Sequence, residues 1–162
     1  MTTTRADIED FLSQRRIAMV GVSRNPKDFS RSLFREMRTR GYDMVPVNLF
    51  AEDIDGEECF QSLHSVSPAV DGILLMTPFW EAERIVQQCA QLRIPRIWMY
   101  RAGKKGASSQ KAIGYCKRHG IRVVEGCPLM FMRETSFPHH VHGFLLKLFG
   151  QYPAKAALSS KI

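Results

Sequence analysis

The turn that begins at Gly21 combines residue types that could hold a phosphate group. In the run GVSRNPKD, the glycine is followed by the Ser23 hydroxyl and by two cations, Arg24 and Lys27. A hydroxyl and cations at the start of a helix can hold a phosphate through charge-assisted hydrogen bonds. The dinucleotide fingerprint G-x-G-x-x-G would need further glycines here. The residues therefore favour a pyrophosphate held partly by side chains, with an ordinary solvated turn as the alternative.

The residues that end the second predicted strand narrow the class of nucleotide. NAD sites place an acidic residue at this position, where its carboxylate binds the ribose hydroxyls. This chain has Val47 and Asn48 there, and its acidic residues begin only at Glu52. A phosphorylated ribose prefers cations and neutral donors. The sequence thus argues against NAD and leaves NADP and coenzyme A.

Short β-rich runs alternate with helical segments along the chain, and these elements must position the turn. Continuous apolar runs bounded by turn residues predict strands at 17–22, 44–48, 72–77, 96–100 and 122–125. Apolar residues at helical spacing predict helices at 5–15, 29–40, 80–92, 109–119 and 138–149, and a short one near 62–66. The rest of 49–71 is expected to be loop.

Single residues mark where several of these elements begin and end. Gly41 and Gly120 follow helical segments and predict their C-terminal ends. Ser108 is expected to be the N-cap of the helix at 109–119. Pro46 cannot donate a ladder hydrogen bond, so it predicts an edge or end position for the second strand.

Five strands separated by helices predict one α/β domain with a Rossmann-like, doubly wound parallel sheet and helices on both faces. Parallel neighbours need long crossover connections, which the helices supply. We expect the domain to span 1–150, with its core at 17–132 and a loosely ordered tail at 151–162. In such sheets, ligands bind at the carboxyl ends of the strands, near the switch in strand order.

A series of runs from about residue 17 to residue 132 carries a family resemblance. The runs are VGVS, MVPVN, GEECFQSL, VDGILLMTP, RIWMY and GIRVVEGCPLMF. Their order and spacing resemble the small stand-alone CoA-binding domain proteins, which are related to the CoA-binding domain of the succinyl-CoA synthetase alpha subunit. The resemblance implies that the protein binds coenzyme A or an acyl-CoA.

The resemblance also implies a set of cofactor-binding residues. The first turn would hold the pyrophosphate, and the second strand end would lie against the adenine and ribose. The third strand end would line the crevice, and the fourth would face the pantetheine arm. In that order the residues are Gly21, Val22, Ser23, Arg24 and Lys27, then Val47 and Asn48, then Thr77 and Pro78, and finally Met99.

No catalytic constellation is recognisable in the sequence, so we expect binding without catalysis. The synthetase needs a phosphorylated histidine on another domain, and the resemblance does not extend to that domain. An NADP-dependent oxidoreductase is an alternative, but it would need a place for a second substrate. Cys127 lies in the resembling run EGCP, where its thiol could form a mixed disulfide with the cofactor.

Three histidines, His139, His140 and His142, invite a metal-site hypothesis. Their spacing near a proline does not match the firm ligand spacing that metal sites use, so we expect no metal. Capping or surface positions are the simpler interpretation of these histidines.

The charge of the chain is positive and unevenly distributed. The net charge is +7, and the basic excess is concentrated in 93–133, whereas 51–60 is acidic. Nucleic-acid binding is therefore a second alternative, although Trp98 and Tyr100 fall in a predicted core strand rather than on a basic face. We expect no nucleic acid and no membrane as partners, and leave a protein partner open.

The four cysteines are scattered and form no CxxC pair, and no apolar run is long enough to span a membrane or to serve as a signal peptide. Unpaired cysteines are typical of a reducing compartment. The expected location is therefore cytoplasmic.

Overall fold

The computed structural model describes residues 3–102 and 105–132, and its centre is a parallel β-sheet. The parallel strands are β1 (Arg16–Val20), β2 (Asp43–Val47), β5 (Gly72–Leu75), β6 (Arg96–Ala102) and β8 (Arg122–Gly126). They lie in the order β2-β1-β5-β6-β8. A two-residue strand, β7 (Lys105–Gly106), pairs antiparallel with the end of β6. The predicted doubly wound α/β sheet is confirmed.

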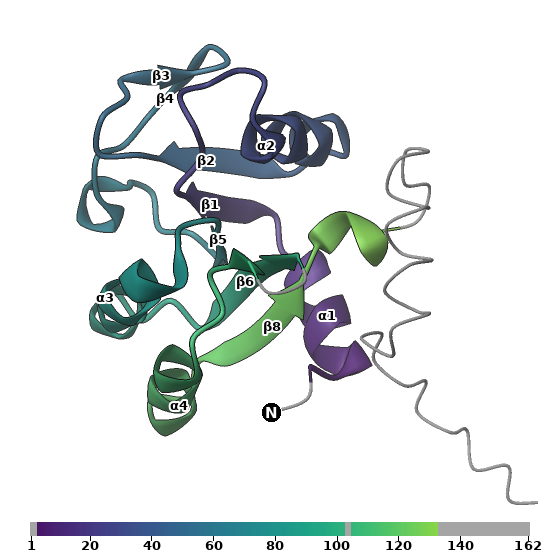
Figure 1. Cartoon of the computed structure of the whole chain (residues 1–162), viewed down its shortest axis with the longest axis vertical. Coiled ribbons are helices and arrows are strands. Elements are labelled where there is room, and N and C mark those ends of the chain that lie inside the picture. The colour runs from purple at the N-terminus through teal and green to yellow at the C-terminus, as the bar shows by residue number, and fades with distance from the viewer. Residues whose placement is uncertain (1–2, 103–104, 133–162) are drawn as a thin grey trace, which may run out of the picture.

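Helices cover both faces of the sheet (Figure 1). Helices α1 (Arg5–Leu12) and α2 (Phe29–Thr39) pack on one face. Helices α3 (Phe79–Gln91) and α4 (Gln110–Arg118) pack on the other. Within the described residues, no helix is both long and apolar enough to cross a membrane.

Successive side chains of each strand enter opposite layers of the core, because strand side chains alternate between the two faces. On β1, Ile17 and Met19 face α1 and α2, whereas Ala18 and Val20 face α3 and α4. Trp98 of β6 belongs to the α1–α2 layer, where its indole N–H donates to the Gly126 carbonyl at 2.9 Å. Both faces of the sheet are therefore shielded from water, which explains why the sequences of its strands are continuous apolar runs.

The second strand lies at the edge of the sheet, as Pro46 predicts. On its outer side, the Pro46 carbonyl accepts a hydrogen bond from the Phe60 backbone N–H at 3.0 Å, and Asn48 N–H donates to the Phe60 carbonyl at 2.9 Å. The proline therefore sits where its missing donor leaves no gap in the pairing with β1.

The segment between β2 and β5 contains a small hairpin that the sequence did not predict. Strands β3 (Asp53–Ile54) and β4 (Glu57–Glu58) pair antiparallel, and Asp55 and Gly56 between them both have positive φ. A 3-10 turn, η1 (Leu63–Ser65), confirms the short helix expected near 62–66, and a second turn, η2 (Pro128–Met130), follows β8.

One predicted cap was wrong by a residue. The N-cap of α4 is Ser109, whose side chain accepts from the Ala112 N–H at 3.4 Å. The Ser108 hydroxyl instead donates to the carboxylate of Glu125 on β8. The predicted C-terminal glycines are confirmed, since Gly41 and Gly120 follow their helices with φ of 91° and 69°. The helix expected at 138–149 and the tail at 151–162 lie outside the described residues.

Candidate functional site

A cavity of about 540 Å³ opens where β1 and β5 end. These neighbouring strands form the switch point of the sheet, because the chain leaves β1 toward β2 and later returns to the other side of β1 at β5. Open α/β sheets bind ligands at this place, in cavities of roughly 300–1,000 Å³. The lining residues are Gly21, Ser23, Asp28, Phe29, Ser30, Met76, Thr77, Pro78, Phe79, Trp80, Tyr100 and Gly106.

The floor of the cavity is a close contact between Gly21, after β1, and Thr77, after β5. Gly21 has a φ of 88°, and a Cβ on it would lie 2.7 Å from Thr77 Cγ2 and 3.0 Å from Thr77 N. Its N–H donates to the Val47 carbonyl at 2.9 Å, which fixes the turn to the end of β2. Only glycine satisfies both the left-handed conformation and the close approach.

The loop from Gly21 to α2 is closed by hydrogen bonds within the chain. Asp28 is the N-cap of α2, and its Oδ1 accepts from Ser30 N at 2.8 Å and from Ser30 Oγ at 2.5 Å. Ser30 Oγ in turn accepts from the Ser23 N–H at 2.9 Å. The turn after β1 and the first turn of α2 are thus held together by the Ser30 hydroxyl.

A buried arginine supports the same loop from behind. Arg31 is only 7% exposed, and its Nη1 donates to the carbonyls of Ser23 at 3.2 Å and Arg24 at 3.3 Å. Its other nitrogens donate to the Asp55 carboxylate in the β3–β4 hairpin, which also accepts from Arg35 Nε at 2.9 Å. These hydrogen bonds, first those from Arg31, lower the pKa of Asp55 to about 2.

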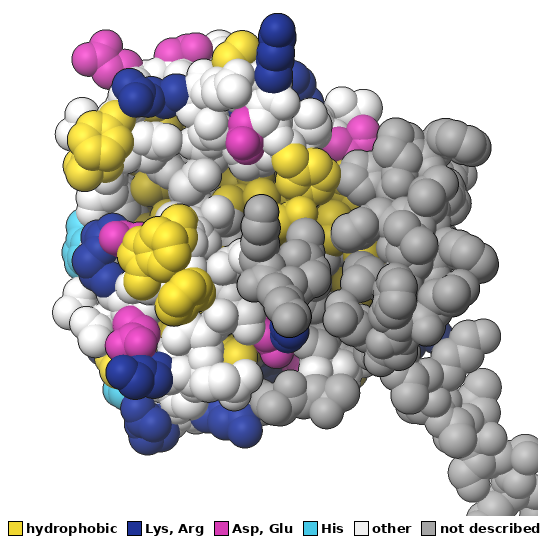
Figure 2. All heavy atoms as spheres, viewed as in Figure 1, with side chains coloured by type: hydrophobic (Ala, Val, Ile, Leu, Met, Phe, Trp, Pro, Cys, Tyr) yellow, Lys and Arg dark blue, Asp and Glu magenta, His cyan; other side chains and the backbone are white. Residues whose placement is uncertain are grey.

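Four aromatic side chains line the cavity. The rings of Phe29 and Tyr100 lie 5.3 Å apart. Phe79 and Trp80, at the start of α3, are 56% and 66% exposed and contact each other edge to face at 5.1 Å. Figure 2 shows hydrophobic side chains exposed over the beginning of α3. These rings offer flat apolar surfaces to a ligand.

One polar atom in the cavity has no partner within the part of the chain that the structure describes. Thr77 Oγ1 is buried from solvent and makes no hydrogen bond there. A buried hydroxyl without a partner costs free energy, so such an atom is a natural contact point for a ligand.

The structure brings together four of the residues predicted for cofactor binding: Gly21, Ser23, Thr77 and Pro78 all line the cavity. The predicted cations, Arg24 and Lys27, are exposed on the loop beside it. The Arg24 guanidinium lies 5.9 Å from the centre of the exposed Phe50 ring. A role for either cation in ligand binding stays a prediction.

The other four predicted residues do not line this cavity. Val22, Val47 and Met99 are buried in the core. Met99 faces α3 and α4, because the alternation along β6 directs Trp98 and Tyr100 to the other face. The Asn48 side chain donates to the Val22 carbonyl at 2.7 Å and accepts from Phe50 N–H at 2.8 Å. Asn48 thereby joins the first turn to the loop after β2.

Sequence reasoning missed the remaining lining residues, above all Asp28 and Ser30. A signal for Asp28 was present, since an Asp immediately before an apolar helical period is a typical N-cap. Tyr100 is different, because the resemblance matches it, with Trp98 and Met99, to the fourth strand, whose end it expects to face the pantetheine arm, and of these three only Tyr100 lines the cavity. Nothing local predicts that the Ser30 hydroxyl meets the Ser23 amide, seven residues earlier.

The Cys127 thiol is fully buried, and burial raises its pKa to about 11. A thiol that stays protonated at neutral pH is a poor nucleophile. These properties argue against the mixed-disulfide hypothesis. His139, His140 and His142 lie outside the described residues, and the described part of the chain contains no group of three metal-ligating side chains.

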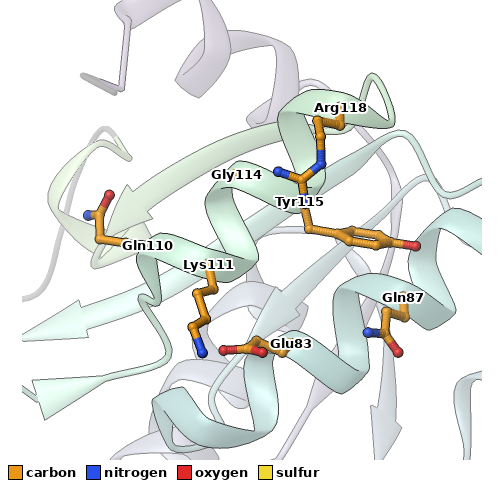
Figure 3. A pocket seen from close by; sticks show the side chains of 7 residues that line it. All are labelled: Glu83, Gln87, Gln110, Lys111, Gly114, Tyr115 and Arg118. Atoms are coloured by element: carbon orange, nitrogen blue, oxygen red, sulfur yellow. The ribbon is translucent and has the colours of Figure 1, made fainter.

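A second hollow, of about 380 Å³, lies between α3 and α4 (Figure 3). Glu83 of α3 and Lys111 of α4 point toward each other across it. Tyr115 lies beside it and stacks on His119 with ring centres 4.0 Å apart. The hollow is lined mainly by polar side chains of two helix surfaces, so it resembles a solvated groove more than a ligand site.

Comparison with known proteins assigns the chain to a family. The sequence profile of one protein family, described as "CoA binding domain", matches residues 15–133, a span that includes every residue lining the cavity.

Two curated relatives differ greatly in length. The uncharacterised protein YneT of Bacillus subtilis is 23% identical over 122 residues, which cover 75% of this chain and 87% of that protein. The acetate–CoA ligase (ADP-forming) II subunit alpha of Pyrococcus furiosus is 21% identical over 124 residues, which cover 72% of this chain. The match spans only 27% of the ligase subunit.

Solved structures share the fold. A hypothetical protein from Pyrococcus horikoshii superposes with a TM-score of 0.70 at 22% identity, covering 76% of this chain and 84% of that one. The dinucleotide-forming acetyl-coenzyme A synthetase 1 of Candidatus Korarchaeum cryptofilum superposes with a TM-score of 0.60 at 18% identity. The match covers 72% of this chain and 27% of the synthetase chain.

Proposed function

The chain belongs to the CoA-binding domain family, and from this premise we propose that it binds coenzyme A or an acyl-CoA in the cavity between the ends of β1 and β5. The observation that carries the proposal is the family match over residues 15–133, and the position of the cavity at the switch point of the sheet supports the choice of site. The relatives that act on coenzyme A carry this domain as about a quarter of their length, so their ligase activity is not proposed for this chain.

Two features of the cavity fit a nucleotide cofactor. The close contact of Gly21 with Thr77 brings the ends of β1 and β5 together at the switch point, where sheets of this kind bind nucleotides. The buried Thr77 Oγ1 offers a hydroxyl without a partner among the described residues. Arg24 and Lys27 would neutralise phosphates from the rim, and the Phe79–Trp80 pair would cover an apolar part of the ligand.

We also propose that the domain binds without a reaction of its own. The ionisable side chains among the described lining residues support this. Asp28 is engaged as the cap of α2, and burial raises the pKa of Tyr100 to about 12, so the phenol stays protonated at neutral pH. Tyr100 is therefore not poised to transfer a proton near pH 7.

A calorimetric titration panel tests the proposal. The ligands are coenzyme A, acetyl-CoA, dephospho-CoA, NAD, NADP and a duplex oligonucleotide. We expect coenzyme A or its acetyl ester to bind best, and dephospho-CoA to bind about 10–100-fold more weakly, as expected for a lost charge-assisted hydrogen bond. Binding of NADP without coenzyme A would favour an oxidoreductase. Salt-sensitive binding of the oligonucleotide alone would favour a nucleic-acid-binding protein.

Paired arginine variants locate the phosphates in the same titration. Arg24→Ala should weaken coenzyme A binding about tenfold, because it removes a cation from the rim. Arg15→Ala is the matched control, since Arg15 is an exposed arginine just before β1, at the other end of that strand from the cavity. Equal affinities for the two variants would remove Arg24 from the site.

A further inference from the structure

The described residues that line the cavity include one carboxylate, Asp28, and neither Lys nor Arg. The Asp28 carboxylate lies at the N-terminal end of α2, where the helix dipole and the first amides attract negative charge. In this chain the Asp28 carboxylate itself already occupies the N-terminal end of α2.

The donors that would serve a phosphate there are already engaged. Ser30 N and Ser30 Oγ both donate to Asp28 Oδ1, at 2.8 and 2.5 Å. The Ser23 N–H, on the loop facing α2, donates to Ser30 Oγ at 2.9 Å. A phosphate could take these donors only by displacing the carboxylate.

We infer that Asp28 competes with the diphosphate of the ligand for the N-terminal donors of α2 and thereby lowers the affinity of the cavity for diphosphate-bearing ligands. The inference rests on the proposed function and adds a residue that sets specificity. With Asp28 in place, the diphosphate is held toward the exposed cations Arg24 and Lys27, and the interior accepts the uncharged part of the ligand.

The repulsion has a predictable size. Two unit charges about 4 Å apart repel weakly in bulk water and several times more strongly in a partly enclosed site. Removing one of them corresponds to about a fivefold to tenfold change in a dissociation constant at the lower end of that range.

The Asp28→Asn variant of the full chain tests the inference. Asparagine caps helices about as well as aspartate, so α2 should keep its N-terminus while the charge is lost. Asp28→Ser is a second variant with the same logic, and thermal unfolding verifies that each is folded. The matched control is Asp43→Asn, which removes an exposed carboxylate at the amino end of β2, whereas the cavity lies at the carboxyl ends of the strands.

Three probes are titrated into each protein: coenzyme A, inorganic pyrophosphate and pantetheine. We expect Asp28→Asn to bind coenzyme A and pyrophosphate about five to ten times more tightly than the original chain. Pantetheine carries no phosphate and should bind both proteins equally. Asp43→Asn should leave all three affinities unchanged.

The outcomes separate the inference from the proposed function. If the original chain binds coenzyme A and Asp28→Asn binds it no more tightly, the competition by Asp28 is disproved while the proposed function stands. If no protein binds coenzyme A, the proposed function fails. The pyrophosphate titration then decides the inference alone, since tighter binding by Asp28→Asn supports it and equal or absent binding overturns it.

Discussion

At the residue scale, the contact between Gly21 and Thr77 is the most demanding in the site. It combines a positive φ with an approach that leaves no room for a Cβ. Gly41 has nearly the same φ, 91° against 88°, yet a Cβ there would meet nothing within 4 Å. Comparing alanine variants of the two glycines therefore separates the free-energy cost of a left-handed conformation from the cost of a steric clash.

We expect Gly21→Ala to destabilise the protein more than Gly41→Ala. Both variants lose about 1–3 kcal/mol for a left-handed alanine. Only Gly21→Ala also forces Thr77 away, which adds about 1–3 kcal/mol of overpacking. Chemical denaturation of both variants measures the difference in the free energy of unfolding. Equal losses of stability would show that the ends of β1 and β5 move apart at little cost.

The importance of Gly21 was predictable, whereas the network around it was not. A glycine directly after a buried strand is a local signal, and so are the hydroxyl and cations that follow it. The Ser30 bridge and the Arg31 support depend on side chains that meet only after α2 has packed against the sheet. Local patterns carry no information about such contacts.

At the element scale, the β3–β4 hairpin is joined to the turn after β1 through Arg31. Asp55 in the hairpin holds Arg31, and Arg31 holds the carbonyls of Ser23 and Arg24. The hairpin escaped sequence analysis because its strands have two residues each, and between Asp53 and Glu58 only Ile54 is a buried apolar residue. Period-two alternation cannot be recognised over so short a stretch.

The Asp55 carboxylate should make stability depend on pH in acid. Its pKa is about 2 in the folded state, below the ordinary 3.8, so its contribution is full above the ordinary pKa and is lost as the pH falls through about 2. We expect Asp55→Asn to cost about 2 kcal/mol at pH 7 and much less near pH 2. Denaturation at both pH values measures this.

Glu58→Gln is the control for the Asp55 variant, because Glu58 is exposed on the same hairpin. It should show little change at either pH. A constant loss for Asp55→Asn across the pH range would mean that the carboxylate charge does not support the loop.

Strand phase explains why Met99 was predicted to face the ligand and does not. A strand buried on both faces reads as a continuous apolar run, so the sequence gives no clue to which side chains face which layer. Once Trp98 is placed in the α1–α2 layer, Met99 must face α3 and α4. Tyr100 then returns to the side of the cavity.

At the scale of the whole molecule, the five strands and the helices between them were predictable, since hydrophobic period and end signals act locally. The strand order β2-β1-β5-β6-β8 was not, because it depends on which way each crossover turns. The position of the cavity at the switch point follows from that order.

The two-layered core encloses all four cysteines: Cys59, Cys89, Cys116 and Cys127. Burial raises the pKa of each thiol, to about 12 for Cys116 and about 11 for Cys127. We therefore expect a soluble aromatic disulfide reagent to label none of them in the folded protein and all four in denaturant. Rapid labelling of one thiol without denaturant would reveal local opening of its layer.

The chain contains two tryptophans, and the fold gives them opposite surroundings. Trp98 is fully buried between Phe11 and Phe131, whereas Trp80 is 66% exposed at the mouth of the cavity. The intrinsic fluorescence of the protein therefore has two sources. Trp98 is shielded from solvent and reports on the integrity of the core, whereas Trp80 is exposed to solvent and reports on the cavity beside it. A quencher dissolved in the buffer reaches only the second, so occupancy of the cavity and unfolding of the domain leave different optical signatures.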